Sequence, residues 1–163
     1  MISFPDAEGL RPTPDRVRET LFNWLGQTLY GRTCLDLFAG SGALGFEAAS
    51  RGAERVVMVE RNSSVCRSLQ ENLNKFGLAN VLLHCRDGLE FITRDNQRYD
   101  VIFLDPPFGG NVLPGLLEIL PLHLSDKGVL YLETGALMEV PFPWKVVKSG
   151  KAGHVFFQLL KIG

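Results

Sequence analysis

The sequence has few cysteines, no long apolar run and almost no net charge, and each shortage excludes a class of protein. Its three cysteines, Cys34, Cys66 and Cys85, show no CxxC spacing, so we expect reduced core thiols and neither a disulfide framework nor a zinc site. No stretch approaches the ~18 apolar residues of a membrane-spanning helix, and no basic-then-apolar leader opens the chain. We therefore expect a cytoplasmic protein with no membrane partner.

The charge balance also limits how the protein could bind a nucleic acid. A formal net charge of −1 means that any such partner must be bound by a local basic patch, because the field of the whole protein is weak. The three histidines have no metal-ligand spacing, so no metal site is predicted. A length of 163 residues with 45% hydrophobic content fits one domain over residues 1–163, which we expect to be a monomer.

Apolar runs alternate with helical patterns along most of the chain. A helix is predicted from Thr13, as its cap, with Pro14 in the first position and Gly26 as its end. Continuous apolar strands separated by helices are typical of a parallel sheet covered on both faces. The predicted strands are 33–37, 55–59, 81–85, 101–104 and 129–132, followed by 144–148 and 155–160 as a hairpin-like pair separated by Gly150 and Gly153.

The stretch TCLDLFAGSGALGFEA, residues 33–48, reads as a strand, a tight glycine turn and a helix start. Gly40, Gly42 and Gly45 would let the chain turn at positive φ, bring N–H groups close to a ligand and allow close packing of helix on strand. The same spacing fits the dinucleotide fingerprint, so it does not distinguish NAD from other adenosyl ligands. A glycine turn without any ligand is the alternative.

Acidic residues occupy the ends of the predicted strands or the positions just beyond them. They are Asp36, Glu60, Asp87 and Asp105. Because the carboxyl ends of parallel strands meet at one edge of the sheet, and ligands bind there, we expect these side chains to face a common site.

The turn Asp105-Pro106-Pro107-Phe108 directly follows a predicted strand. Two prolines remove two N–H donors and stiffen the turn, which leaves acceptors between a carboxylate and an aromatic ring. Such a site suits an exocyclic amino group: Asp105 and the Pro106 carbonyl would accept its two hydrogens while Phe108 stacks on the base. The alternative is a stiff turn in which Asp105 caps a helix and Phe108 belongs to the core.

Together, DLFAGSGALG, Glu60 and DPPF resemble the class I S-adenosylmethionine-dependent methyltransferases that act on exocyclic amino groups. GLRPTPDRVRETLFNWL at 9–25, DLFAGSGALGFEA at 36–48 and KAGHVFFQLLK at 151–161 are similar to the bacterial RsmD family. That family methylates a guanine 2-amino group in 16S ribosomal RNA. The resemblance implies an α/β, Rossmann-like fold with a mostly parallel seven-stranded sheet, helices on both faces and an antiparallel C-terminal strand pair.

The resemblance also implies roles for individual residues. S-adenosylmethionine would be bound by Thr13, Asp36, Phe38, Gly40, Gly42, Glu60, Arg61, Asp87, Gly88 and Asp105. Within that set, Glu60 would bind the ribose hydroxyls and Asp87 would face the adenine. The catalytic turn would be Asp105, Pro106, Pro107 and Phe108. The partner would be 16S ribosomal RNA or a small-subunit assembly intermediate, contacted by Arg11, Arg16 and Arg18.

One departure from the family pattern concerns the start of the chain. Family members usually carry a basic, glycine-containing segment before GLRPT, and only eight residues precede Gly9 here. Three alternatives stay open: an NAD-dependent oxidoreductase, an amino methyltransferase acting on adenine or on DNA, and an RNA-binding protein that has lost activity. The oxidoreductase reading gives no reason for the DPPF turn.

Overall fold

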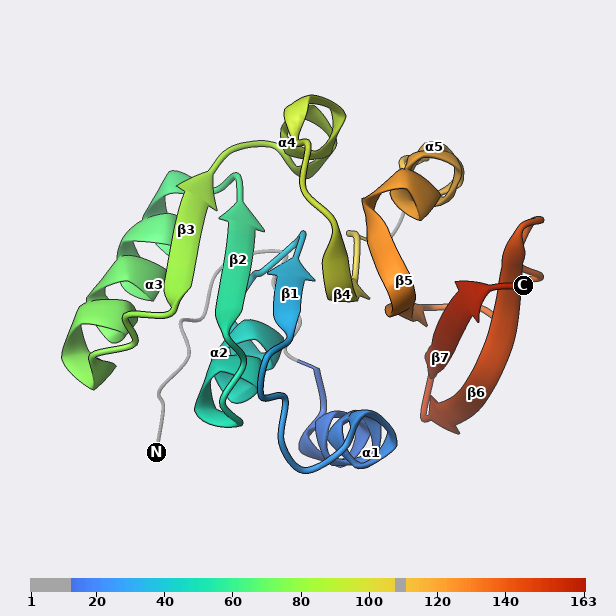
Figure 1. Ribbon diagram of the computed structural model, residues 1–163, viewed down its shortest axis with the longest axis horizontal. Coiled ribbons are helices and arrows are strands. Elements are labelled where there is room, and N and C mark those ends of the chain that lie inside the picture. The colour runs from blue at the N-terminus through green and yellow to red at the C-terminus, as the bar shows by residue number, and fades with distance from the viewer. Residues whose placement is uncertain (1–12, 108–110) are drawn as a thin grey trace.

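A mixed seven-stranded sheet organises the molecule, in the order β3-β2-β1-β4-β5-β7-β6 (Figure 1). The computed structural model describes residues 13–107 and 111–163. The strands are β1 Thr33–Asp36, β2 Arg55–Glu60, β3 Val81–Cys85, β4 Tyr99–Leu104, β5 Leu124–Thr134, β6 Trp144–Ala152 and β7 Val155–Ile162. The predicted fold class, a Rossmann-like sheet with an antiparallel C-terminal pair, is confirmed.

The first five strands are parallel, and their carboxyl ends therefore lie at one edge of the sheet. β1 is central and pairs with β2 and β4, while β4 also pairs with β5. β7 runs antiparallel between β5 and β6, so β6 is an outermost strand of the sheet. The strand order reverses between β1 and β4, which is the position where open α/β sheets bind their ligands.

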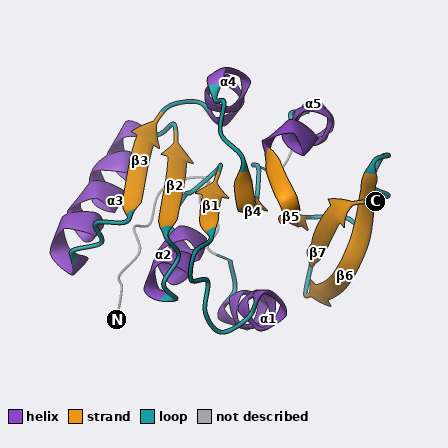
Figure 2. Ribbon diagram, in the orientation of Figure 1, coloured by secondary structure: helices purple, strands orange, loops and turns teal. Residues whose placement is uncertain are grey.

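Helices cover both faces of the sheet (Figure 2). α1 Asp15–Leu25, α2 Ala43–Ser50 and α3 Ser63–Phe76 share one hydrophobic core with one face of the sheet. α4 Gly88–Arg94, α5 Leu113–Ile119 and the 3-10 helix Leu120–His123 pack on the other face. Alternation along the strands separates the two cores: Phe103 and Tyr131 face α1, whereas Ile102 and Leu132 face the opposite core.

The sequence predicts a helix that starts at Asn62 and ends at Gly77, and α3 has both of these ends. The Asn62 side chain accepts hydrogen bonds from the N–H groups of Ser64 and Val65, at 3.0 and 3.1 Å, and so caps the helix. Gly77 ends it in the left-handed conformation, with φ of 62°.

Three predictions about elements were wrong. Thr13 does not cap α1: Pro14 takes the cap position without a side-chain hydrogen bond, and the Thr13 hydroxyl donates elsewhere. Gly150 does not separate the last two strands but lies inside β6, and the Phe157 ring packs where its Cβ would stand. Cys85 is exposed at the end of β3, whereas Cys34 and Cys66 are buried as predicted.

None of the helices in the described ranges is both long and apolar enough to cross a membrane.

Candidate active site

The glycine turn joins β1 to α2 in the conformation that the sequence predicted. Gly40 and Gly42 have φ of 53° and 85°, values that favour glycine, and Gly42 is the N-cap of α2. A Cβ on Gly45 would lie 3.0 Å from the Met58 side chain, so this glycine allows α2 to pack closely on β2. The turn therefore combines left-handed backbone with a close approach of helix to strand.

Glu60, at the end of β2, ties the glycine turn to the start of α3. Its Oε1 accepts the N–H of Gly40 at 3.0 Å, and its Oε2 accepts the N–H of Asn62 at 2.8 Å. Each carboxylate oxygen can accept a second hydrogen bond. Glu60 is only partly buried, so it can still bind two adjacent hydroxyl groups of a ligand.

Asp36, at the end of β1, is a buried carboxyl group with 3% of its surface exposed. Its Oδ2 accepts the N–H of Gly45 at 3.1 Å. Burial raises the pKa of Asp36 to about 7, despite the opposing hydrogen bond from Gly45, and the nearby Glu60 charge adds to the rise. A positively charged ligand group beside Asp36 would favour its ionised form.

Four more of the residues expected to bind the cofactor, Phe38, Arg61, Asp87 and Gly88, lie after β1, β2 and β3. A Cβ on Gly88 would lie 3.1 Å from the Phe38 ring, so the ring packs against this glycine. Asp87 caps α4 by accepting the N–H of Glu90 at 3.1 Å, and both Asp87 and Arg61 are exposed. The structure brings Phe38 and Gly88 together and leaves two charged side chains open to a ligand.

The Asp105-Pro106-Pro107 turn follows β4 at the same edge of the sheet as the glycine turn. Asp105 is partly buried, Pro106 is buried and Pro107 is exposed. Phe108, predicted to stack on a base, lies outside the described residues. Asp105 thus follows a strand that lies between β1 and β5, and β1 is the strand that leads into the glycine turn.

A buried acidic residue that the sequence reasoning missed lies at the end of β5. Glu133 is 3% exposed, and its Oε2 accepts hydrogen bonds from Thr13 Oγ1 at 3.2 Å and from Tyr131 Oη at 2.7 Å. The signal was present in the sequence, because Glu133 directly follows the predicted apolar strand 129–132, as Glu60 directly follows the predicted strand 55–59. Thr13, predicted among the cofactor residues, is buried in this contact.

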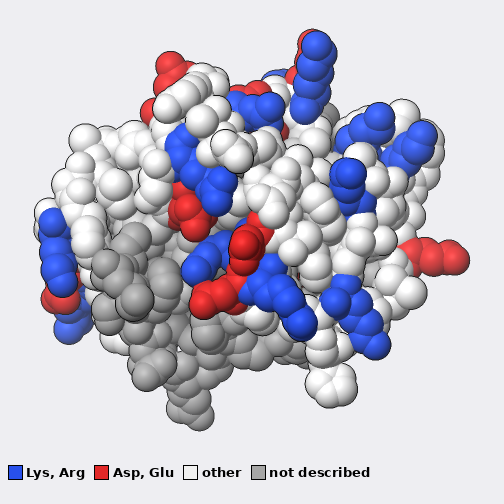
Figure 3. Space-filling model, turned by 90° about the horizontal axis from the view of Figure 1, so that it is seen from below, with Lys and Arg blue, Asp and Glu red and all other residues white. Residues whose placement is uncertain are grey.

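The predicted RNA-binding arginines are placed unevenly. Arg16 is exposed on α1, whereas Arg18 donates to Asp15 at 2.9 Å and lies 3.8 Å from Glu47. Arg11 is outside the described residues. Figure 3 shows Lys and Arg side chains next to Asp and Glu in the middle of the face seen from below, so acidic groups offset the basic ones in that part of the described surface.

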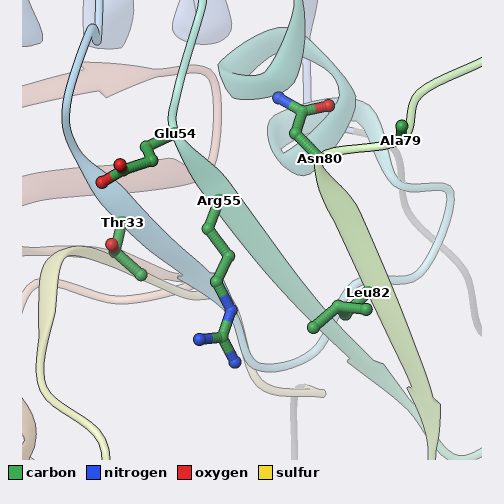
Figure 4. A pocket seen from close by; sticks show the side chains of 6 residues that line it. All are labelled: Thr33, Glu54, Arg55, Ala79, Asn80 and Leu82. Atoms are coloured by element: carbon green, nitrogen blue, oxygen red, sulfur yellow. The ribbon is translucent and has the colours of Figure 1, made fainter.

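A pocket of about 450 Å³ lies at the opposite edge of the sheet (Figure 4). Thr33 and Arg55, the first residues of β1 and β2, line it together with Asn80, which precedes β3. Because ligands of such sheets bind at the carboxyl ends of the strands, we assign the active site to the other edge. No group of three or more His, Cys, Asp or Glu side chains within 13–107 and 111–163 could hold a metal ion.

Comparison with known proteins agrees with this arrangement. The family model described as conserved hypothetical protein 95 matches residues 1–161. Ribosomal RNA small subunit methyltransferase D of Escherichia coli K12 is 38% identical over 160 residues, covering 95% of this chain and 81% of the relative. The protein of the same name from Haemophilus influenzae is 37% identical, covering 94% and 84%.

Solved structures give the same assignment. The yhhF protein of Escherichia coli, described as a candidate methyltransferase, superposes with a TM-score of 0.89 and 34% identity, covering 99% of this chain and 90% of that one. A precorrin methyltransferase from Geobacter metallireducens, at 20% identity and a TM-score of 0.74, shares the fold. These relatives favour methyl transfer over the oxidoreductase alternative. The chain belongs to the RsmD family, the family whose model is described as conserved hypothetical protein 95.

Proposed function

We propose that the protein transfers a methyl group from S-adenosylmethionine to the exocyclic 2-amino group of a guanine in 16S ribosomal RNA. The observation that carries the proposal is that two turns follow the paired strands β1 and β4 at the same edge of the sheet. One is the glycine turn, which Glu60 binds, and the other is the Asp105-Pro106-Pro107 turn. Relatives named as ribosomal RNA small subunit methyltransferases support the choice of substrate.

The residues at this edge fit the proposed cofactor. Glu60 keeps acceptor capacity for two ribose hydroxyls, and Phe38 offers a ring beside Gly88 for the adenine. Arg61 and Asp87, which follow β2 and β3, are exposed and can contact the same ligand. Asp36 is a buried carboxyl whose ionised form a cationic ligand would favour, as the sulfonium and amino groups of the methionine part would. When bound, the cofactor supplies a methyl group on a positively charged sulfur that is a good leaving group.

The protein's own residues would orient the nucleophile. The Asp105 carboxylate and the Pro106 carbonyl would accept the two hydrogens of the amino group, which directs the nitrogen lone pair toward the methyl group. Asp105 would also stabilise the positive charge that develops on nitrogen as it attacks. The proton then leaves to solvent, and no covalent enzyme intermediate is required. Phe108 would stack on the base.

We propose that the protein acts as a monomer. Thr13, which the resemblance placed near the cofactor, has its hydroxyl engaged with Glu133. We therefore propose that Thr13 affects the cofactor site only indirectly, through its position just before α1.

Mass mapping of the methylated base tests the function. The protein would be incubated with S-adenosylmethionine and unmodified 16S ribosomal RNA, either free or in assembled small subunits, and the product digested and mapped. We expect one methyl group on a guanine N2. A methyl group on adenine or on a ring carbon would contradict the guanine assignment. Calorimetry showing binding of NAD, with none of S-adenosylmethionine, would contradict the cofactor assignment.

A further inference from the structure

We propose that Glu133 and Tyr131 are positioning residues for Asp105, which hold the base-binding turn in place for methyl transfer without touching the cofactor. The proposal rests on the function proposed above and assigns a role to two buried residues that the mechanism does not use. It predicts that their loss changes turnover much more than cofactor affinity.

The first step of the argument is the cost of the arrangement. Tyr131 is fully buried and Glu133 is 3% exposed, so a carboxyl group and a phenol hydroxyl have both left water. Their 2.7 Å hydrogen bond, with the 3.2 Å bond from Thr13, offsets part of that cost. Apolar residues of similar volume would fill the same space without it. A polar network in this place therefore needs a reason beyond packing.

The second step is where the network lies relative to Asp105. Phe103 is paired with Tyr131, and Leu104 with Leu132, in the β4–β5 register. Asp105 follows Leu104 directly after the end of β4, and Glu133 follows Leu132 within β5, so the two residues lie side by side. Alternation places both on the α1 face of the sheet, where Phe103 and Tyr131 also lie.

The third step is contact with the residues that carry Asp105. The rings of Phe103 and Tyr131 lie 6.4 Å apart, edge to face, so the position of Tyr131 bears on the end of β4. Tyr131 is also near enough to Asp105 to sense the charge of its carboxylate: burial raises the pKa of the Tyr131 hydroxyl, and the charges of Glu133 and then Asp105 raise it further. Glu133 orients the Tyr131 ring, and the ring supports the strand end from which Asp105 projects.

The chain contains a matched control for a merely structural role. Tyr99, at the start of β4, is also fully buried, and its hydroxyl donates to a carboxylate, Asp95, at the same 2.7 Å. It lies at the opposite edge of the sheet from Asp105. Tyr99→Phe and Tyr131→Phe therefore remove equivalent hydrogen bonds, and only the second is next to the proposed site.

The experiment compares single-turnover methyl transfer and cofactor affinity in the two variants. We expect Tyr131→Phe to lower the rate at least about tenfold and to leave the Kd for S-adenosylmethionine within about twofold, since small misplacements of a reacting group are costly. Tyr99→Phe should lower the thermal midpoint by a similar amount and keep the parent rate. Equal rates in the two variants, or a parallel loss of affinity and rate, would overturn the proposal.

A second pair of measurements keeps the test sharp. Glu133→Gln retains an acceptor for Thr13 and Tyr131, so it should fold and keep more activity than Glu133→Leu. Independently of activity, amide resonances of residues 103–105 should shift in Tyr131→Phe and stay in place in Tyr99→Phe; unmoved resonances would contradict the positioning role. An inactive parent protein would overturn the proposed function and this inference together, whereas an active parent with two equivalent variants would overturn the inference alone.

Discussion

The candidate active site has two halves, one proposed to bind the cofactor and one proposed to bind the base, and different kinds of contact hold them. At the ends of β1 and β2, Glu60 accepts backbone N–H groups from Gly40 and Asn62, which lie 20 and 2 positions away in the sequence. At the end of β5, Glu133 accepts a side-chain hydroxyl from Thr13, which lies 120 positions away. The proposed cofactor half is thus held by backbone hydrogen bonds across at most 20 positions, and the proposed base half also depends on a side-chain contact between segments 120 positions apart.

We expect the largest effect when the proposed acceptor for the base is removed, a change that tests the base half apart from the cofactor half. Asp105→Ala should lower the single-turnover rate at least ~100-fold, because loss of an acceptor at a developing charge costs about 3 kcal/mol or more. Affinity for S-adenosylmethionine should fall far less than the rate. Asp105→Asn, which keeps one acceptor oxygen, should fall between the two in rate. Unchanged turnover in Asp105→Ala would refute the mechanism.

The reciprocal change should affect the cofactor half. Glu60→Ala should weaken binding of S-adenosylmethionine and of its demethylated product by about 1 to 3 kcal/mol, since the ribose hydroxyls lose their acceptor. Titration calorimetry measures this directly. Asn62→Ala is the control. It removes the N-cap of α3, which follows Glu60, at a cost of about 1 kcal/mol in stability, and it removes no proposed ligand contact. Equal affinity of Glu60→Ala and the parent would exclude the ribose-binding role.

The effect of pH on the cofactor half depends on Asp36. Because burial raises its pKa to about 7 in the folded protein, Asp36 favours folding at low pH, and this stabilisation is lost as the pH rises through 7. A cationic ligand binds the ionised form, so cofactor affinity should rise with pH up to about 7, by roughly tenfold per unit below it, and then level off.

Asp36→Asn removes the titrating group and is the control for that pH dependence. We expect the affinity of this variant for S-adenosylmethionine to stay constant between about pH 5.5 and 7, apart from changes in the ligand itself. Calorimetry at several pH values on parent and variant makes the comparison. An identical slope in both proteins would show that another group controls it.

The smallest expected effect concerns the arginines on α1. Arg18→Glu should weaken binding to a ribosomal RNA fragment across sequences, with affinity that falls steeply with salt. Its contribution should be only about 1 kcal/mol, because Arg18 is already shared between Asp15 and Glu47. Arg94→Glu, on the opposite face of the sheet, is the control. Salt-independent binding in the parent would show that the arginines and Lys145, Lys148 and Lys151 are an ordinary solvated surface.

What the sequence predicted follows the same division. The three glycines, the cap at Asn62 and the end at Gly77 were read correctly because each depends on a few neighbouring residues. Thr13 was misread as a cap for the same reason: a threonine before Pro14 has the local features of one, and its actual partner on β5 is distant in sequence. β5 extends from Leu124 because Arg98 and Asp100 bind its first residues. No local pattern contains those contacts.

The lysines of β6 show a second limit of sequence reasoning. Lys145, Lys148 and Lys151 are spaced three residues apart in the sequence, a pattern that predicts a local basic patch, and all three are exposed. The structure places them on the edge strand of the sheet, where lysines also prevent pairing with another chain. Position in the sheet, which the sequence does not state, supplies this alternative to RNA contact.

The packing of α1 has a consequence for the order of folding. This 11-residue helix precedes every strand, yet its Trp24 ring stacks on Phe157 of β7 at 5.3 Å, and Thr13 just before it binds β5. An isolated helix of this length is marginal in water, and contacts between distant segments form slowly. We expect α1 to become protected only when β7 has paired with β5. Pulse-labelled hydrogen exchange during refolding would reveal the opposite order as early protection of the α1 amides.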